Sequence, residues 1–180
     1  GLSCTKNFET KKNIYKYKIK EILKSKLDEK NKKKQISFLK KRFIHEVKAR
    51  RRNLKNINSL KRKYKKLEIH DHHEAHAASA YFYSGWKKCY VLTIDGWGDD
   101  SSSKLYKANN GKLTQLSVTS SIDSLGYFYG SITKLLGYKP HRHEGKILGL
   151  AAFGNYKKAY SPISKMISYD KINKCFKGNY

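Results

Sequence analysis

The distribution of glycine and proline divides this chain of 180 residues into two parts with different folding possibilities. Up to Leu67 there is one glycine, at the first position, and no proline, whereas the remainder holds eleven glycines and both prolines. Since these residues mark turns and interrupt helices, we predict a basic helical region over residues 1–67 and a turn-rich α/β domain over residues 68–180. Apolar residues at helical spacing support the first prediction, at Ile36, Leu39, Phe43 and Val47.

The first part of the chain carries most of its charge. The chain has 40 Lys and Arg against 14 Asp and Glu, a formal net charge of +26, and residues 1–68 hold 25 of the basic and 6 of the acidic residues. Such a charge is typical of proteins that bind nucleic acids or acidic membranes. The lysines are, however, mixed with many Asn, Ile and Tyr, as a strongly AT-biased genome would produce. We therefore interpret the run from Lys48 to Lys66 as a solvated helix packed by one thin edge, and we expect neither nucleic acid nor membrane as a partner.

The cysteines and the hydropathy indicate a cytoplasmic protein. Cys4, Cys89 and Cys175 are widely spaced and form no CxxC motif, so they predict neither a disulfide framework nor a thiolate zinc site. No window approaches the ~20 apolar residues that span a bilayer. The chain also begins without Met, which suggests that its beginning is truncated.

Residues 68–180 alternate between helical and strand patterns. The apolar, β-branched run of residues 89–94 predicts a strand buried on both faces. The sequence Asn109-Asn110-Gly111 tolerates positive φ angles and predicts a hairpin between two further strands. Three helices are expected in this part, over residues 73–83, 124–136 and 144–153.

Three side chains in this part are candidate metal ligands. His72 and His76 are one helical turn apart, so their imidazoles point to the same side and can bind one metal ion. Asp95 follows the predicted buried strand, where a carboxylate needs a cation or hydrogen-bond donors to offset its desolvation. An ion held by the two histidines would supply that cation. Two imidazoles and a carboxylate suit iron, zinc and manganese alike.

The residues around this candidate site suggest nucleotide binding. Gly96 and Gly98, in the sequence Asp-Gly-Trp-Gly-Asp, would let the backbone approach phosphate oxygens closely. Glu144 and Lys146 stand at the entrance of a predicted helix of small residues, where they could position a nucleotide or a polar substrate. An ordinary exposed helix start with solvated charges explains that pair equally well.

Four stretches in this order resemble the carbamoyltransferase family of the NodU and CmcH type. The family combines an HHxxHAASA helix, a DGxG(E/D) loop after a strand, a Ser-Leu-Gly-x-x-Tyr segment and an ExKxMGLAxYG helix. The matching stretches here are residues 72–80, 95–99, 124–129 and 144–154. The resemblance implies an actin-like ATPase (ribonuclease-H-like) fold, present in part and preceded by the basic helical segment. Within the family pattern, Ala152 replaces the usual proline.

The resemblance also implies a chemistry. Carbamoyl phosphate and ATP would give a carbamoyl-adenylate, whose carbamoyl group passes to a hydroxyl of a small molecule such as a sugar or secondary metabolite. By matching position, His72, His76 and Asp95 would be the catalytic metal ligands, with iron as the expected ion. Gly96 and Gly98 would lie against the nucleotide phosphates, and Glu144 and Lys146 would line the pocket.

Parts of that enzyme are missing from this chain. A fourth metal ligand, an Asp from far downstream, has no counterpart before residue 180, and neither has the YrdC-like domain that forms the adenylate. We therefore expect a fragment truncated at its C-terminus. Two alternatives remain: a relative of the tRNA threonylcarbamoyl-transfer enzymes, and a noncatalytic basic protein that binds nucleic acid.

Overall fold

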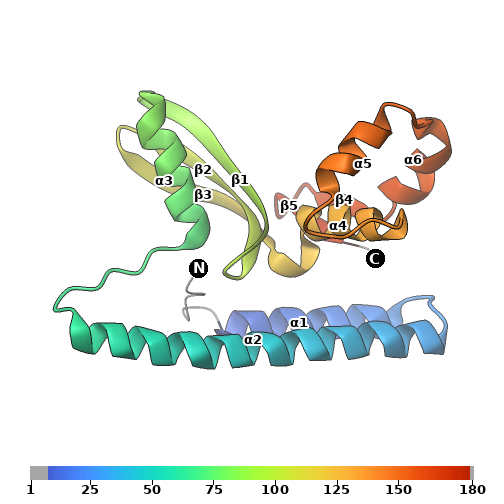
Figure 1. The fold of residues 1–180 in the computed structure, drawn as a ribbon, viewed down its shortest axis with the longest axis horizontal. Helices are drawn as coiled ribbons and strands as arrows, with labels where there is room; N and C mark the ends of the chain where they lie inside the picture. The colour runs from blue at the N-terminus through green and yellow to red at the C-terminus, as the bar shows by residue number, and fades with distance from the viewer. Residues whose placement is uncertain (1–7, 179–180) are drawn as a thin grey trace. The chain divides into compact units, whose positions relative to one another are not determined.

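The computed structural model describes residues 8–178, which belong to two compact units, Gly1–His70 and Asp71–Tyr180. The sequence prediction placed the boundary after residue 67. The described part of the first unit contains two helices, whereas the second unit begins with one helix and contains the β-strands (Figure 1). The described part of the chain is therefore mixed α/β, and both of its sheets are antiparallel.

The first unit is a hairpin of two helices, α1 (Phe8–Lys24) and α2 (Glu29–Lys63), which pack side by side. Asp28 accepts the N–H of Asn31 at 2.9 Å and so caps the start of α2. Between the helices, the ring of Tyr15 lies 5.2 Å from that of Phe43, and its hydroxyl donates to the buried carboxylate of Glu46 at 2.6 Å. The predicted helical character of this region is thus confirmed.

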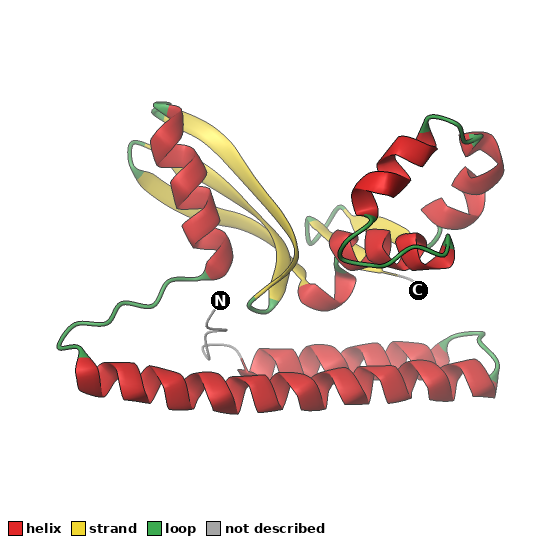
Figure 2. Ribbon diagram, in the orientation of Figure 1, coloured by secondary structure: helices red, strands yellow, loops and turns green. Residues whose placement is uncertain are grey.

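The second unit is built around a three-stranded sheet with one helix on its face (Figure 2). The strands β1 (Lys88–Gly98), β2 (Ser101–Asn109) and β3 (Lys112–Ser120) follow one another in sheet order. The helix α3 (His72–Ser84) packs against β1 and β2. The core between helix and sheet consists of Ala77, Tyr81, Val91, Tyr106 and Ala108.

Glycine-containing turns end these elements where the sequence indicated. Gly85 ends α3 in the left-handed conformation, with φ of 72°. At the tip of the β2–β3 hairpin, Asn110 and Gly111 have φ of 46° and 83°, as the predicted hairpin requires. The turn at Gly85 separates α3 from β1, and the turn at Gly111 joins β2 to β3. The two turns thereby set which residues of these elements face each other.

The prediction that β1 is buried on both faces is wrong. Val91 faces α3 and is buried, but Tyr90, Leu92 and Ile94 on the opposite face are 68%, 58% and 54% exposed. The described residues place no element over these three side chains. A continuous apolar run shows that a strand can be covered on both sides, but not that the covering layer is part of the same chain.

The rest of the second unit consists of short elements. A 3-10 turn, η2 (Ser121–Asp123), leads into α4 (Leu125–Leu135) and α5 (Glu144–Ala151), both of which the sequence predicted. The sequence did not predict the elements after them, α6 (Tyr156–Ser164), β4 (Ile167–Asp170) and β5 (Cys175–Gly178). Among the described residues, no helix has both the length and the apolar character needed to cross a membrane.

Candidate metal centre

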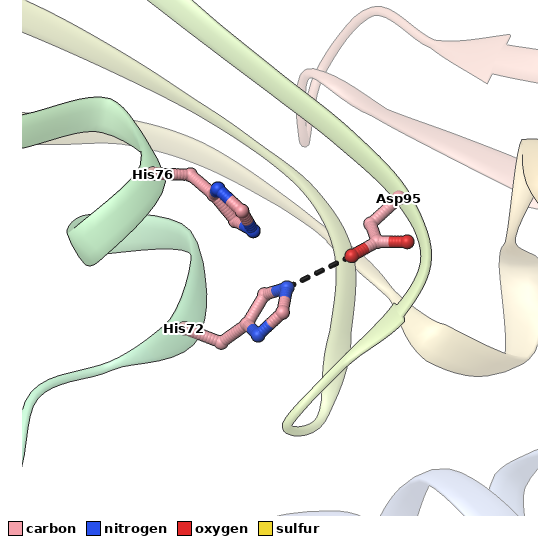
Figure 3. Close-up of side chains that lie close together, drawn as sticks. All are labelled: His72, His76 and Asp95. Carbon is pink, nitrogen blue, oxygen red and sulfur yellow. Dashed lines mark hydrogen bonds and ion pairs between the residues drawn. The ribbon is translucent and has the colours of Figure 1, made fainter. Parts of the chain in front are cut away.

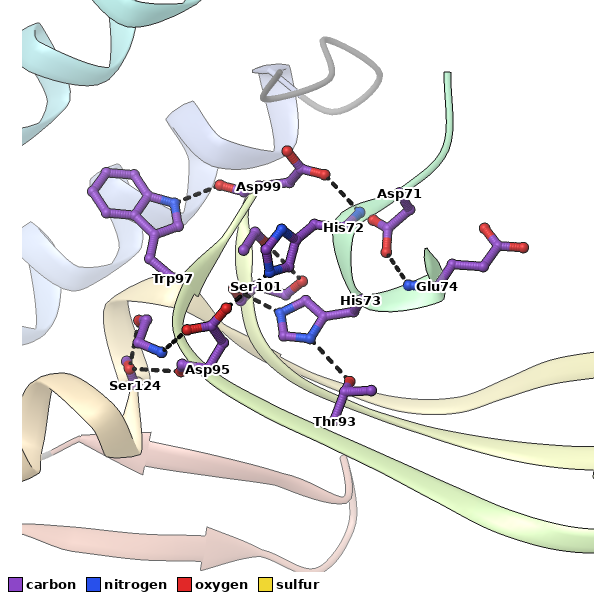
Figure 4. Close-up of polar contacts among 12 residues, drawn as sticks. Asp71, His72, His73, Glu74, Thr93, Asp95, Trp97, Asp99, Ser101 and Ser124 are labelled. Atoms are coloured by element: carbon purple, nitrogen blue, oxygen red, sulfur yellow. Dashed lines mark hydrogen bonds and ion pairs between the residues drawn. The ribbon is translucent and has the colours of Figure 1, made fainter. Parts of the chain in front are cut away.

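The start of α3 is tied to the sheet by two carboxylates. Asp71 accepts the N–H of Glu74 at 3.0 Å and the ammonium of Lys104, from β2, at 2.8 Å. Burial alone would raise the pKa of Asp71, but Lys104 and the N–H of Glu74 outweigh it and lower the pKa. Asp99 adds a second bond by accepting the backbone N–H of His72 at 3.0 Å. The first turn of α3 is therefore held at β2 through Lys104 and at the turn after β1 through Asp99. Figure 4 shows the second of these contacts.

His72, His76 and Asp95 converge beside this helix start (Figure 3). Nε2 of His72 lies 2.8 Å from Oδ2 of Asp95, and the two imidazole centroids are 4.6 Å apart. One ligand atom from each residue lies within 4.8 Å of the others. Burial raises the pKa of Asp95, but His72 and the N–H of Gly96 outweigh it, so the carboxyl pKa is lowered. The carboxylate is thus ionised at neutral pH.

This donor set fits a divalent metal ion. With metal–ligand bonds of about 2.1 Å, neighbouring tetrahedral ligand atoms lie about 3.4 Å apart. Separations of up to 4.8 Å therefore close around one ion after small side-chain rotations. His76 is exposed and Asp95 half-buried, which leaves coordination positions open on the solvent side. The sequence analysis predicted the same three residues as metal ligands.

His73 points the other way from the two candidate ligands and anchors the helix. Its side chain is fully buried. Nε2 donates to the carbonyl of Ser101 at 3.2 Å, and Nδ1 lies 2.9 Å from the hydroxyl oxygen of Thr93, which also donates to the carbonyl of Lys104. Burial of the ring lowers the pKa of His73, which favours its neutral form. This residue thereby joins α3 to both β1 and β2.

Gly98 makes room for a candidate ligand. A Cβ atom on Gly98 would lie 2.2 Å from Cδ2 of His72, so any side chain there would displace the imidazole. A Cβ on Gly96, in contrast, would meet no atom within 4 Å. The carbonyl of Gly96 accepts the hydroxyl of Ser124, the residue that caps α4, at 2.7 Å. The predicted phosphate contacts of both glycines stay predictions, but Gly98 has a structural reason to lack a side chain.

Glu144 and Lys146 lie on α5 and are not grouped with the three candidate ligands among the described residues. Oε1 of Glu144 accepts the backbone N–H of His141 at 2.6 Å, and this bond lowers the pKa of the carboxyl. Lys146 is exposed. Their proposed contacts with a nucleotide stay predictions.

Sequence reasoning missed several residues that position the site. Asp71 and Glu74 form the D-x-x-E pattern of a capping box, which could have marked the start of α3. Asp99, Thr93 and Ser101 offered no such signal, because their partners lie at least 20 residues away in sequence.

Comparison with known proteins supports the family that the motifs indicated. A model of the family described as carbamoyltransferase N-terminus matches residues 3–179. An uncharacterized protein of Methanocaldococcus jannaschii is 33% identical over 100 residues, which is 56% of this chain and 20% of that protein. The nodulation protein NolNO of Sinorhizobium fredii is 37% identical over 90 residues, or 50% of this chain and 13% of that protein.

A second nodulation protein, NolO of Bradyrhizobium diazoefficiens, is 36% identical over 85 residues, which is 47% of this chain and 15% of that protein. The chain thus spans a fifth or less of the length of these relatives. Because the family model covers nearly all of its residues, the chain belongs to the family of carbamoyltransferase N-terminal regions.

Proposed function

We propose that this chain is the metal-binding part of an O-carbamoyltransferase. The full enzyme would transfer the carbamoyl group of carbamoyl phosphate, by way of a carbamoyl-adenylate made with ATP, to a hydroxyl of a sugar or other small molecule. The observation that carries the proposal is the meeting of His72, His76 and Asp95 in a chain of this family. Under the proposal, the second unit is part of an actin-like fold, and a YrdC-like domain elsewhere in the enzyme forms the adenylate.

In this proposal the chain's residues hold and orient the reacting groups. His72 and His76 each offer an imidazole nitrogen, and Asp95 supplies a negative charge, so the site is suited to a divalent cation. A bound ion, with iron expected and zinc or manganese as alternatives, would polarise the carbamoyl carbonyl and stabilise the charge that develops in the transition state. The open space at Gly96 lets a phosphate approach the backbone next to Asp95.

The metal part of the proposal predicts that His76→Ala abolishes metal retention. The purified chain is loaded with Fe²⁺ under anaerobic conditions, or with Zn²⁺ or Mn²⁺, then desalted and assayed by inductively coupled plasma mass spectrometry. We expect about one ion per wild-type chain, and a loss of at least tenfold in the variant, because only two ligands remain. The exposed His70 lies outside the group, so His70→Ala is the matched control. Equal metal content in His76→Ala and His70→Ala would disprove the ligand assignment.

The transferase part needs the complete open reading frame that contains these residues. Incubation with ¹⁴C-carbamoyl phosphate, ATP and a panel of sugars should give labelled product, and Asp95→Asn should lower the rate at least a hundredfold. Labelled product at the wild-type rate from Asp95→Asn would refute a role for the site in transfer.

One observation favours a second candidate, transfer to tRNA. The exposed face of α2 carries a cation at every seventh residue, at Lys34, Lys41, Lys48, Lys55 and Arg62. Seven residues are about 10.5 Å of helix, so these charges form a slowly winding row about 42 Å long. Binding of tRNA that falls steeply with salt, together with no carbamoylation of sugars, would establish this candidate over the first.

A further inference from the structure

Asp99 directs its carboxylate at the backbone of a candidate metal ligand. Its Oδ2 accepts the N–H of His72 at 3.0 Å, although the two residues are 27 positions apart in sequence. His72 is the first residue of α3, and the N–H groups of a first helical turn have no partner within the helix. Among the described residues, Asp99 is not one of the three whose atoms could share one ion, so any effect it has on the site passes through His72 (Figure 4).

The start of α3 does not need this bond in order to form. Asp71 already caps the helix by accepting the N–H of Glu74 at 3.0 Å. The buried ring of His73 adds contacts with both β1 and β2. Removal of the Asp99 carboxylate should therefore cost the fold little, and its effect should be concentrated at His72.

His72 is held at three points by one short segment, residues 95–99. At one end of the segment, Oδ2 of Asp95 lies 2.8 Å from Nε2 of His72, and at the other end Asp99 accepts the N–H of the same residue. Between these ends, Gly98 lies against the edge of the imidazole and leaves no room for a side chain. A side chain held in this way loses little conformational freedom when it binds an ion.

Trp97 in turn holds the backbone of Asp99. Its indole N–H donates to the carbonyl of Asp99, and its ring lies edge to face against that of Tyr127 on α4, with 6.3 Å between the centroids. Hydrogen bonds therefore run from the indole to the backbone of Asp99, and from its carboxylate to the first residue of α3. Bonds of this kind around a metal site orient the ligands without touching the ion.

We propose that Asp99 is a positioning residue of the metal centre, which holds His72 beside Asp95 so that an arriving ion meets a preformed pair of ligands. The side chain of His76 is exposed, and it completes the site by turning toward that pair. The inference rests on the metal part of the proposed function and adds a residue that orients a ligand without coordinating the ion. Because the role needs an acceptor oxygen and not a negative charge, asparagine can fill it.

The test compares Asp99→Gly with Asp99→Asn in the purified chain. Asp99 has φ of 56°, a left-handed conformation that glycine and asparagine both tolerate, so neither variant strains the backbone. Glycine removes the acceptor, whereas asparagine keeps a carbonyl oxygen in its place. Co²⁺ is the probe, since its visible absorption reports both its affinity and the arrangement of its ligands.

We expect Asp99→Gly to weaken Co²⁺ binding about tenfold or more and to change the absorption bands, whereas Asp99→Asn keeps the affinity and the bands of the wild type. Asp100→Ala is the matched control, since it removes a carboxylate one residue later that has no hydrogen bond or ion pair with the described residues. Wild-type affinity in Asp99→Gly would overturn the inference. An equal loss in Asp99→Asn or Asp100→Ala would also overturn it, because charge alone would then explain the effect. Circular dichroism that shows an unfolded Asp99→Gly would assign the bond to folding instead.

An NMR measurement on the metal-free chain separates this inference from the proposed function. Because the ring of His72 lies against Gly98, its Hδ2 should show a nuclear Overhauser effect to Hα of Gly98 in the wild type and in Asp99→Asn, and lose it in Asp99→Gly. If the wild type binds no metal, the proposed metal centre is refuted, and this effect still decides whether Asp99 places the imidazole. If the wild type and Asp99→Gly bind metal equally well, the metal centre stands and the inference is refuted.

Discussion

Replacement of Gly98 by alanine is the sharpest test of how the candidate metal centre is built. The new Cβ would lie 2.2 Å from Cδ2 of His72, whereas ordinary contacts begin at 3.4 Å. The imidazole must therefore retreat by roughly 1.2 Å, more than twice the ~0.5 Å within which a metal site holds its ligands. His72 would leave its position next to Asp95 or force the first turn of α3 away from the sheet.

The expected loss of metal affinity is 10- to 100-fold, which corresponds to about 1.4–2.8 kcal/mol. Overpacking should also lower the free energy of unfolding by about 1–3 kcal/mol. Zinc affinity is measured by competition with a chelating dye, and stability by urea denaturation followed by circular dichroism. The two measurements separate a displaced ligand from a chain that has failed to fold.

Gly96→Ala is the matched control, since it adds the same methyl group two residues earlier, where no atom lies within 4 Å. It should keep wild-type zinc affinity, and weaken nucleotide binding if a phosphate approaches the backbone there. Equal zinc affinity in Gly98→Ala and wild type would refute the reasoning, because it would mean that His72 is not a ligand or does not lie against Gly98.

Two further predictions follow from buried and capping contacts. His73→Ala removes both bonds of a fully buried ring and leaves a cavity, so urea denaturation should show a free energy of unfolding lowered by about 2–4 kcal/mol; a loss below about 0.5 kcal/mol would contradict the anchoring role. The pKa of Glu144 is lowered from its ordinary value of 4.5. Its hydrogen bond to the N–H of His141 is therefore fully present above pH 4.5 and is lost as the pH falls through the lower pKa of the folded state. In an NMR titration the amide resonance of His141 should shift with a midpoint below pH 4.5, and Glu144→Gln should remove that transition; a midpoint above 4.5 would show that the bond is not formed.

Local patterns were enough to locate most of the larger elements. The absence of internal glycine and proline identified the helical first part, and Gly85 and Gly111 marked turns that the structure contains. The meeting of His76 with Asp95 was also predictable, because a carboxylate at the end of an apolar strand needs a partner and a histidine pair is the nearest one in sequence. The chemical properties of these side chains were therefore enough to predict that they meet, without knowledge of how the helix packs on the sheet.

Other features depend on contacts that no local pattern encodes. The helix α6 has no buried residue and contains Pro162, and β4 and β5 are four residues each, so their hydrophobic patterns are too short to detect. The reason that position 98 is glycine lies in a histidine 26 residues earlier, at His72. Likewise, a sequence cannot show which face of β1 is covered, since an apolar run is compatible with either.

The exposed row on β1 has a consequence for the behaviour of the chain in solution. Tyr90, Leu92 and Ile94 lie on a strand at the edge of the described sheet, which is an arrangement that favours strand-to-strand association between molecules. The net charge of +26 opposes such contacts by repulsion, but that repulsion is screened within ~8 Å at physiological ionic strength, whereas apolar attraction is not. Added salt should therefore promote aggregation of this protein, so its colloidal stability depends on ionic strength.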